Sequence, residues 1–458
     1  MTAFGELLEH ALKGVEADYA EIRLEETEAS NIRYRGQEVE EAGIYSSLGG
    51  NVRALVKGAW GLVSFNDLPQ PRELREKVAL AVKQARLAGR EESHLAPTPP
   101  VVEGLQEKPN PDPLAIPLAQ KNDLLDQYKE IILSTPGITT SIVAYSDGWK
   151  RTVFASSQGS YVEQTRSDVA LQVLAVARDG GKVQHTSLSV GSRGDFLQIA
   201  HLHPQVREMS RRAVELLSAP RVKGGEYTVV LDPILAGVFA HEAFGHLSES
   251  DFLYENPGLR EIMVLGKRFG EGILNIVDDA SIPGLRGSYK YDDEGVPARK
   301  NYLIREGILV GRLHSRETAA KMGESPSGNA RAASYRFPPI VRMSNTFIEP
   351  DTANLEDLLE GIEEGVYARN WHGGMTSMEM FTFSAGEAFM IRKGKLAELI
   401  RPVVLSGNVF TTLGLIDGIA RDLDMNQGGG CGKGDQYPLP VSNGSPHIRI
   451  RKCLVGGR

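Results

Sequence analysis

The sequence predicts an α+β fold, in which an N-terminal α/β region is followed by a β-rich C-terminal domain. In the first half, segments of helical period stand next to runs in which apolar and polar residues alternate, and this order recurs once. Beyond Gly270 the apolar runs are short and broken by Gly, Pro and Asn. At 458 residues the chain exceeds the size at which one core usually stops growing, so two or three domains are expected.

The first predicted domain is an α+β unit over residues 1–92. Residues 3–16 have the spacing of an amphipathic helix, and residues 17–41 alternate like a solvated antiparallel strand pair. Short strands broken by glycines follow over 49–67, and residues 71–89 return to helical period. The domain should therefore pack helices against an antiparallel sheet.

A proline-rich linker over residues 93–117 separates this unit from a second one. Its prolines lack the backbone donors that a regular strand ladder needs. Residues 118–222 form the predicted middle α+β domain, with a helix near 117–135, strands within 138–181 and a helix near 205–219. Because the order of the first unit recurs, we infer a duplicated α/β unit, although the two copies share little sequence identity.

The third predicted domain, residues 223–458, is β-rich. It begins with a buried strand in residues 224–233 that runs directly into an apolar helix. A further helix is predicted near residues 354–366. The helix after the first strand carries most of the residues that can do chemistry.

The central candidate site is the hexapeptide HEAFGH, from His241 to His246. Neutral imidazoles are good zinc ligands, and Glu242 beside the first of them could take a proton from metal-bound water. The histidines are five residues apart, which places their rings about 140° apart on a regular α-helix. Because glycine accepts irregular backbone, we expect the helix to end at Gly245 or to carry a π-bulge there. The alternative is a helix that merely contains one buried and one exposed histidine.

A catalytic zinc usually has three protein ligands and a water, so a third ligand is needed. Cys431 in NQGGGCGKGDQ is the best candidate, because flanking glycines let the backbone approach a site and a metal holds the thiolate deprotonated. The segment is not a P-loop, since Gln427 and Gly434 stand where that motif requires Gly and Ser or Thr. The alternative is an inert thiol in a flexible turn. Cys453 lies in a strand-like segment and is predicted to be a packing residue.

Composition and charge exclude several classes of protein. The formal net charge of −8 repels phosphate backbones, so no nucleic-acid partner is expected. The N-terminus lacks the basic lead and unbroken apolar core of a signal peptide, and no segment has the length of a membrane span. Two cysteines do not describe a disulfide scaffold. We therefore expect a cytoplasmic protein with no membrane partner.

Several longer motifs carry a family resemblance. From about residue 228 to the end the chain contains, in order, HEAFGHLSESD, GSYKYDDEGVPA, SGNARAASYRFPPIVRMSNTFIEP, FTFSAGEAFMI and GGGCGKGDQ. Residues 33–67, RYRGQEVEEAGIYSSLGGNVRALVKGAWGLVSFND, match as well. In these motifs the sequence resembles the TldD/PmbA family, formerly called modulators of DNA gyrase, and specifically its metal-bearing TldD branch.

This resemblance implies a zinc metallopeptidase that cleaves short or unfolded peptides with little sequence preference. His241, His246 and Cys431 would be the metal ligands, with Glu242 catalytic. Low preference would follow if an extended peptide added as a strand to a sheet edge, because ladder bonds read only the backbone. The family also implies a dimer, either a homodimer or a heterodimer with a TldE/PmbA-type paralogue that lacks the metal motif. Because this chain keeps the motif, we expect it to be the active type of subunit.

Two other functions use the same residues. In a regulatory or binding protein of the gyrase-modulator type the metal would be structural, and Glu242 beside a ligand would have no role. A metal-dependent hydrolase of another amide would share the whole site chemistry, so only substrate profiling would separate it from a peptidase.

Other polar residues are weaker candidates. Two acidic clusters lack the spacing of an EF-hand and are predicted to be solvated loops rather than hard-cation sites: Asp278-Asp279 and Asp292-Asp293-Glu294. Three further side chains could line a peptide groove or polarise a carbonyl, but structural roles are expected for them: His314, Arg331 and His372.

Overall fold

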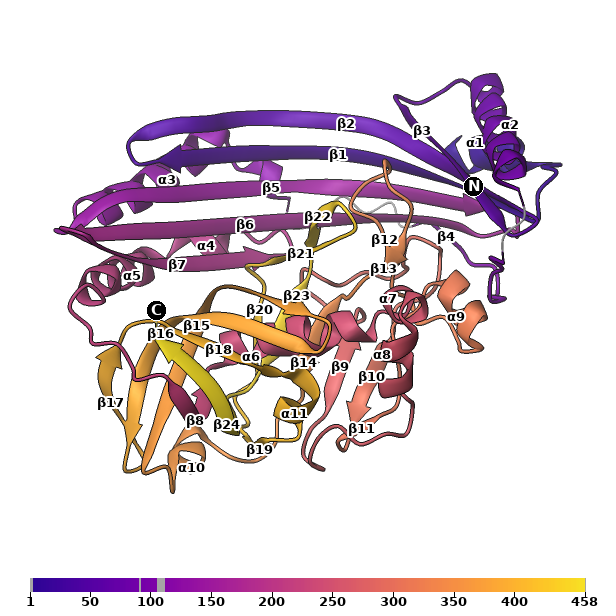
Figure 1. Ribbon diagram of the computed structural model, residues 1–458. Coiled ribbons are helices and arrows are strands. Elements are labelled where there is room, and N and C mark those ends of the chain that lie inside the picture. Colours follow the sequence, from indigo (N-terminus) through magenta and orange to yellow (C-terminus); the bar gives the residue numbers. More distant parts are fainter. Residues whose placement is uncertain (1–2, 90–91, 105–111, 458) are drawn as a thin grey trace.

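One long antiparallel sheet organises the N-terminal half of the molecule. In the computed structural model, which describes residues 3–89, 92–104 and 112–457, this sheet lies across a β-rich C-terminal half (Figure 1). Its strand order is β3-β2-β1-β5-β6-β4, with β7 also paired to β6. The strands are β1 (Tyr19–Arg35), β2 (Glu38–Val56), β3 (Ala59–Asn66), β4 (Val102–Gly104), β5 (Ile138–Ser156), β6 (Tyr161–Asp179) and β7 (Lys182–Ser192). Only β4 runs parallel to its neighbour.

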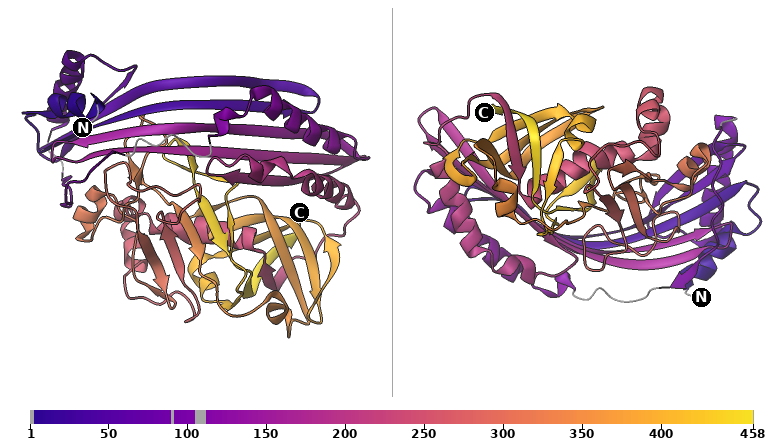
Figure 2. Two further views of the ribbon diagram at one scale, coloured as in Figure 1. Left: turned by 180° about the vertical axis from the view of Figure 1, so that it is seen from behind. Right: turned by 90° about the horizontal axis from the view of Figure 1, so that it is seen from below.

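Helices cover one face of this sheet at its two ends, and the other face curves around the C-terminal half (Figure 2). The helices at one end pack with β1–β3 into one apolar cluster, and the helices at the other end pack with β5–β7 into another. Each long strand contributes side chains to both faces of the sheet, because successive side chains point to opposite sides. The helices are α1 (Ala3–Leu12) and α2 (Pro71–Ala88) at one end, and α3 (Leu118–Leu133), α4 (Leu197–Ala200) and α5 (His203–Glu215) at the other, with a 3₁₀ turn, η1 (Pro113–Ala115).

The repeated order of elements predicted from the sequence is present. Helix, three strands and helix occur as α1-β1-β2-β3-α2 and again as α3-β5-β6-β7-α5. The two sets have separate apolar clusters but share one sheet, because β1 pairs with β5 along most of both strands. The division into 1–92 and 118–222 stays a prediction, and residues 105–111 of the predicted linker lie outside the described residues. The rest of that linker contains β4, a strand that its prolines had argued against.

Two sheets build the C-terminal half. In the first, β15, β8, β24, β18 and β16 close into a ring through the β15–β16 pairing, and β17 and β19 add to it. Its strands are β8 (Gly225–Leu231), β15 (Glu364–Ser377), β16 (Met380–Arg392), β17 (Lys395–Ile400), β18 (Val403–Asn408), β19 (Ile416–Ile419) and β24 (Ile448–Gly457). The second has the order β11-β10-β9-β14-β23-β20, with strands β9 (Ile276–Asp279), β10 (Lys300–Arg305), β11 (Ile308–Leu309), β14 (Asn345–Ile348), β20 (Asp424–Asn426) and β23 (Ser442–Ser445).

Shorter elements connect these two sheets. Two strand pairs stand apart from them: β12 (Ala330–Arg331) with β13 (Ile340–Val341), and β21 (Gly430–Lys433) with β22 (Gln436–Pro440). The helices are α6 (Pro233–Phe239), a π-helical turn η2 (Ala240–Gly245), a 3₁₀ turn η3 (His246–Ser248), α7 (Ser250–Glu255), α8 (Pro257–Ile262), α9 (Arg316–Met322), α10 (Leu355–Leu359) and α11 (Val409–Leu413). In the described ranges, none of the helices combines the length and the apolarity that crossing a membrane requires.

The helix predicted over 354–366 is much shorter than its pattern indicated. It ends at Leu359, and Gly361, at φ +76°, turns the chain into β15. Strand pairing decides this boundary, because residues from Glu364 onward pair with β16. Local helical period is a weak preference that such tertiary pairing overrides.

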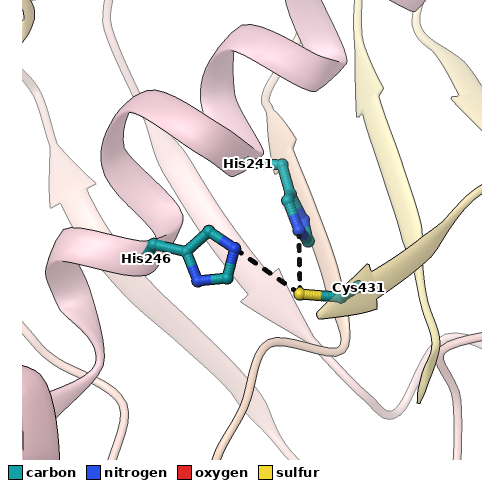
Figure 3. Close-up of side chains that lie close together, drawn as sticks. All are labelled: His241, His246 and Cys431. Atoms are coloured by element: carbon teal, nitrogen blue, oxygen red, sulfur yellow. Dashed lines mark hydrogen bonds between the residues drawn. The ribbon is translucent and has the colours of Figure 1, made fainter. Parts of the chain in front are cut away.

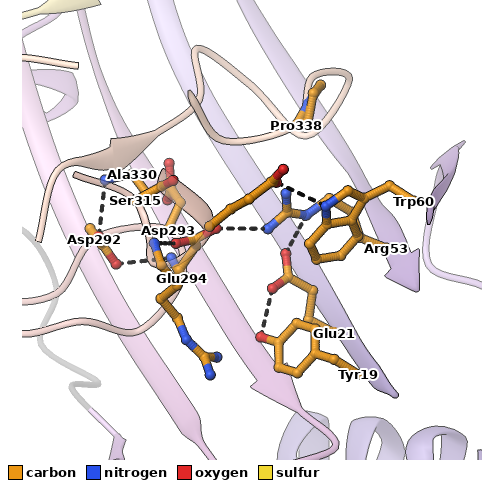
Figure 4. A network of polar contacts seen from close by, with 12 residues as sticks. Tyr19, Glu21, Arg53, Trp60, Asp292, Asp293, Glu294, Ser315, Ala330 and Pro338 are labelled. Carbon is orange, nitrogen blue, oxygen red and sulfur yellow. Dashed lines mark hydrogen bonds and ion pairs between the residues drawn. The ribbon is translucent and has the colours of Figure 1, made fainter. Parts of the chain in front are cut away.

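Buried ion pairs join the long sheet to the C-terminal half (Figure 4). Arg53 on β2 lies 2.6 Å from Glu21 and 3.2 Å from Glu294, and its guanidinium also covers the Trp60 ring. Arg23 on β1 pairs with Asp293 at 3.0 Å. The sheet therefore contributes cations and the loop after residue 290 contributes carboxylates, which fixes how the two halves meet.

The prediction of solvated loops for both acidic clusters is wrong. Asp292 is buried and accepts the backbone amides of Glu294, Val296 and Ala330. Asp278 is fully buried and accepts four side-chain or backbone donors from Asn329, Ser344 and Thr346. Both clusters therefore brace loops and strands, since buried carboxylates need such partners.

Replacing Arg53 tests this junction. The Arg53→Met variant leaves the carboxylates of Glu21 and Glu294 buried without their cation, so the free energy of unfolding should fall by about 3–5 kcal/mol. Urea denaturation followed by tryptophan fluorescence measures the loss. Arg72→Met, at an arginine that is 91% exposed and pairs only with Glu76, is the control and should leave stability nearly unchanged. Equal effects of the two substitutions would show that the junction does not depend on these ion pairs.

Candidate metal centre

A capped helix start positions the HEAFGH segment. Strand β8 ends at Leu231, and Asp232 caps α6 by accepting the backbone amide of Leu235 at 2.8 Å, with Pro233 in the first turn. The same carboxylate accepts the amide of Asn370 on β15 at 3.1 Å. This ties the start of the helix to two strands of the closed ring, so the residues that follow emerge at a fixed place.

The helix leaves regular α-helical bonding where the two histidines lie. Residues Ala240–Gly245 form a π-helical turn, and the amide of His246 donates to the carbonyl of His241, an i+5 to i hydrogen bond. This confirms the predicted irregularity and selects the π-bulge among the alternatives. The wider turn brings both imidazoles to one side, with ring centroids 5.2 Å apart (Figure 3).

Gly245 is required here by packing rather than by an unusual backbone. Its φ of −57° and ψ of −52° are helical, so any L-residue could adopt this backbone. A Cβ at this position would lie 2.1 Å from Sδ of Met343, a residue with no exposed surface. The glycine therefore lets the π-turn lie directly against β-strand neighbours in the core.

Cys431 meets both histidines from the opposite side of the centre (Figure 3). It lies on β21, and its Sγ is 3.3 Å from Nε2 of His241 and 3.5 Å from Nε2 of His246. The three ligand atoms all lie within 4.8 Å of one another. The structure thus brings together the three residues that the sequence proposed, although Cys431 is 190 positions from His241.

The loop that carries Cys431 is clamped against the N-terminal sheet. Arg286 pairs with Asp168 on β6 at 2.6 Å and donates to the carbonyls of Gln427 and Gly429 at 2.6 and 2.9 Å. A Cβ at Gly428 would lie 2.4 Å from the backbone of Ser189 on β7. The glycines thus serve close backbone packing, which argues against the alternative of a flexible turn for this segment.

A chain of charges behind His246 was missed by sequence reasoning. Nδ1 of His246 lies 3.0 Å from Glu249, and the same carboxylate lies 3.0 Å from Nζ of Lys433, which also pairs with Asp251 at 2.6 Å. Burial would raise the pKa of Glu249, but Lys433 and His246 lower it to about 2. Such a carboxylate fixes the orientation of a ligating imidazole. Its signal in the sequence is an acidic residue three positions after His246, with a lysine two positions after Cys431.

The three central side chains set one another's charge. Burial alone would raise the pKa of the Cys431 thiol, yet the two imidazoles, which contact its sulfur, hold that pKa well below its usual value. Burial likewise would lower the pKa of His246, but Glu249 and Cys431 raise it well above the usual value. The thiol therefore gives up its proton readily, and a deprotonated sulfur is what a metal ligand requires.

The donor set fits a zinc ion. Two imidazole nitrogens and a thiolate are ligands of catalytic zinc sites, and donors on one tetrahedral zinc lie about 3.5 Å apart when Zn–S and Zn–N are about 2.3 and 2.0–2.1 Å. The two sulfur–nitrogen distances in the structure, 3.3 and 3.5 Å, agree with this spacing. Nδ1 of His241 is buried and has no hydrogen-bond partner among the described residues, in contrast to Nδ1 of His246.

Glu242 lies at the open side of the centre. Its Oε2 is 3.9 Å from Nε2 of His246, and its side chain is 27% exposed. Together with His241 it lines a cleft of about 570 Å³ between the N-terminal sheet and the C-terminal half. A carboxylate thus faces space that a substrate can enter, directly beside the three donors.

The weaker candidates lie outside this cluster. His314 is buried among Ser250, Thr318 and Glu324, and Arg331 donates to the carbonyls of Met343 and Pro440. His372 stacks on His185 with ring centroids 4.2 Å apart. Cys453 is buried in β24, where burial raises the pKa of its thiol to about 12. Within the described chain only His241, His246 and Cys431 form a group with metal-binding geometry.

The chain matches known proteins over most of its length. Sequence profiles of the PmbA/TldA metallopeptidase domain 1, central domain and C-terminal domain match residues 20–85, 111–217 and 224–457. A metalloprotease of Synechocystis is 49% identical over 444 residues, which is 96% of this chain and 95% of that protein. The chain belongs to the PmbA/TldD metallopeptidase family. It is a metalloprotease of this family, and the family expected from its motifs is confirmed.

Further relatives agree in sequence and in fold. A zinc metalloprotease TldD homolog of Saccharolobus solfataricus is 35% identical over 339 residues, covering 73% of this chain and 75% of the relative. The crystal structure of TldE from Thermococcus kodakarensis superposes with a TM-score of 0.78 at 20% identity, over the whole of both chains. A putative modulator of a DNA gyrase from Thermotoga maritima gives a TM-score of 0.76 at 19% identity, over 99% of this chain and 100% of that one. These two structures share the fold.

Gly245 offers a test of the π-turn's packing. Gly245→Ala should destabilise the protein by about 1–3 kcal/mol, because the new methyl group overlaps Sδ of Met343. In a double-mutant cycle Met343→Ala should remove most of that penalty, since it empties the space that the methyl group needs. Thermal unfolding of the four proteins measures the coupling. Gly272→Ala, where a Cβ meets nothing within 4 Å, is the control, and additive effects of the two core substitutions would refute the overlap.

The thiol of Cys431 gives a pH-dependent signal after metal removal. Folded, chelator-treated protein should contain one thiolate per chain at pH 7, because the lowered pKa keeps Cys431 ionised while burial keeps Cys453 protonated. On unfolding, the pKa of Cys431 returns to about 8.5, so a proton is taken up at pH 7. Thiolate absorbance in the ultraviolet measures both states. Cys431→Ser should abolish the signal, whereas persistence of the signal in that variant would contradict the assignment.

Proposed function

We propose that this metalloprotease is a zinc enzyme that hydrolyses short or unfolded peptides with low sequence specificity. His241, His246 and Cys431 hold the ion, and Glu242 is the general base. The observation that carries the proposal is the convergence of these three donors within 4.8 Å, beside a carboxylate that lines an open cleft. A purely structural metal would give Glu242 no role there.

The chemistry divides between the ion and the chain. When bound, zinc lowers the pKa of a coordinated water toward about 7 and polarises the scissile carbonyl. Glu242, which lies 3.9 Å from a ligand nitrogen, accepts the proton of the attacking water and passes it to the leaving amine. Glu249 and Lys433 hold the ring of His246, so the general base keeps its place relative to the ligands.

The shape of the cleft supports extended, unstructured substrates. Its walls come from the concave face of the long sheet on one side and from α6, β15 and β21–β22 on the other. A folded protein would have to open a segment to reach Glu242 between these walls. Within the described chain β7 and β21 each have one partner strand, and residues 187–189 and Gly430 on them line the cleft. A peptide added to such an edge is read by its backbone, which gives low sequence preference.

We also infer a dimer in the cytoplasm, either a homodimer or a heterodimer with a TldE/PmbA-type paralogue. Support comes from the shared fold with TldE of Thermococcus kodakarensis and from exposed apolar side chains at the tip of the β15–β16 hairpin. These side chains, Met375, Met378 and Met380, are each more than half exposed. Sedimentation of the purified chain, alone and with such a paralogue, measures the association.

Metal content tests the ligand set. We expect about one zinc per chain, lost from His241→Ala, His246→Ala and Cys431→Ala but retained by Cys453→Ala. Elemental analysis after dialysis measures it, with circular dichroism to show that the variants are folded. Loss of zinc from Cys453→Ala together with retention by Cys431→Ala would overturn the choice of third ligand.

Glu242 and the choice of substrate test the reaction. Glu242→Gln should keep zinc and fold yet lose at least about a hundredfold in turnover of an unstructured peptide, because an amide cannot accept the proton of water. Mass spectrometry of digests measures it, with Glu255→Gln on α7 as a control that should keep activity.

Wild type should cut varied unstructured peptides and leave a stable folded protein intact. Normal turnover by zinc-loaded Glu242→Gln, or cutting of folded protein at the same rate, would contradict the proposal.

A further inference from the structure

A second, smaller cavity lies beside the metal cleft and is rich in cations. It encloses about 230 Å³ between the concave face of β5 and β6 and the strand β22, which approaches them in Figure 1. It is not separate from the cleft that contains His241 and Glu242, because residues on their common wall line both. These shared residues are Ser146, Asp168, Arg286, Pro438 and Pro440.

Most charges around this cavity are already paired. Arg286 is neutralised by Asp168 at 2.6 Å, and Lys150 pairs with Glu25 at 3.1 Å. Asp147 pairs with the buried Lys121 at 2.5 Å, so it offers no free charge to the cavity. Two cations among the lining residues remain, and these are Arg166 and Arg193.

Arg166 and Arg193 have no carboxylate partner among the described residues. The structure shows one hydrogen bond from Arg193, to the carbonyl of Ser288 at 3.3 Å. Asp293 lies in the electrostatic field of Arg166, but its ion pair is with Arg23. Both residues line the same cavity. Burial lowers the pKa of Arg193, and the like charge of Arg166 lowers it further. Two cations without an ion-pair partner in a partly buried cavity are costly, and an anion bound beside them relieves that cost.

We propose that Arg166 and Arg193 bind a carboxylate of the peptide substrate in this cavity. The inference rests on the proposed peptidase function and adds a specificity subsite to it. A guanidinium presents its donors as a planar fork that matches a carboxylate, and such charge-assisted bonds are the strong ones. The cavity admits one acidic side chain or one chain terminus. Because every peptide has a C-terminal carboxylate, an anchor of this kind is compatible with low sequence preference.

The subsite would also set the register of the substrate. Asp168 and Arg286 belong to both cavities, so a chain whose carboxylate lies between Arg166 and Arg193 continues along the common wall toward Glu242. The number of residues between the anchored carboxylate and the scissile bond is then fixed by the structure. Two sources can supply this carboxylate, the C-terminus of the peptide or an Asp or Glu side chain.

Binding to the Glu242→Gln protein tests the subsite without turnover. The probe is one short neutral peptide in three forms: with a free C-terminus, with an amidated C-terminus, and amidated with a single Asp moved through each position. Calorimetry should show that a form with a carboxylate binds at least about tenfold more tightly than the neutral form. When Arg166→Gln and Arg193→Gln are added to this protein, the tighter binding of the carboxylate forms should vanish. The affinity for the neutral form should stay unchanged. The Lys/Lys pair, Arg166→Lys/Arg193→Lys, should retain part of it.

The controls separate the outcomes. Arg178→Gln changes an exposed arginine at the far end of the same strand β6 and should leave every affinity unchanged. Preference for the free C-terminus assigns the α-carboxylate, and preference for one Asp position assigns a side chain. Equal affinity for charged and neutral forms, or a preference that survives the double substitution, would overturn the subsite. If wild type cuts none of the peptides, the proposed function fails, whereas the binding result still decides the cavity.

Discussion

One backbone hydrogen bond underlies the metal centre, the bond from the amide of His246 to the carbonyl of His241. Two ligands five residues apart diverge on an α-helix, and only a wider turn places them on one side. The turn packs directly against Met343, and this is possible because Gly245 has no Cβ to overlap with its Sδ. The irregular turn is therefore built into the core, and it brings the two histidines together without needing an ion.

Cys431, the proposed third ligand, makes the candidate metal centre depend on both halves of the molecule. Cys431 reaches the histidines from a loop that Arg286 ties to the long sheet and that packs, through Gly428, on β7. The sheet thus does more than cover the cleft, since it holds a metal ligand in place. Buried ion pairs such as Arg53 with Glu294 fix the same junction at a distance from the centre.

Electrostatics gives each polar group near the cleft a distinct role. Glu249 is held charged by Lys433 and orients the ring of His246, whereas Glu242 pairs with no lysine in the described chain and faces the cleft. Arg166 and Arg193 face the adjoining cavity without an acidic partner in the described chain. A peptide bound along the common wall would then be held by its backbone, by the reacting carbonyl and by one carboxylate. In the proposed function, these contacts would favour an extended chain over a folded surface.

The sequence by itself predicted the residues of the candidate centre and the α+β class of the fold. The HEAFGH motif and Cys431 indicated the three candidate donors and the carboxylate. Apolar–polar alternation and helical period predicted the strands and helices of the N-terminal half, because these patterns depend on local spacing. Tertiary structure decided the rest. Contacts between distant segments show that Gly245 is required for packing and that the two N-terminal units share one sheet. They also bury the Asp292 cluster. Such contacts leave no periodic trace, so Lys433 and Arg286 acquire their roles only when the chain is folded.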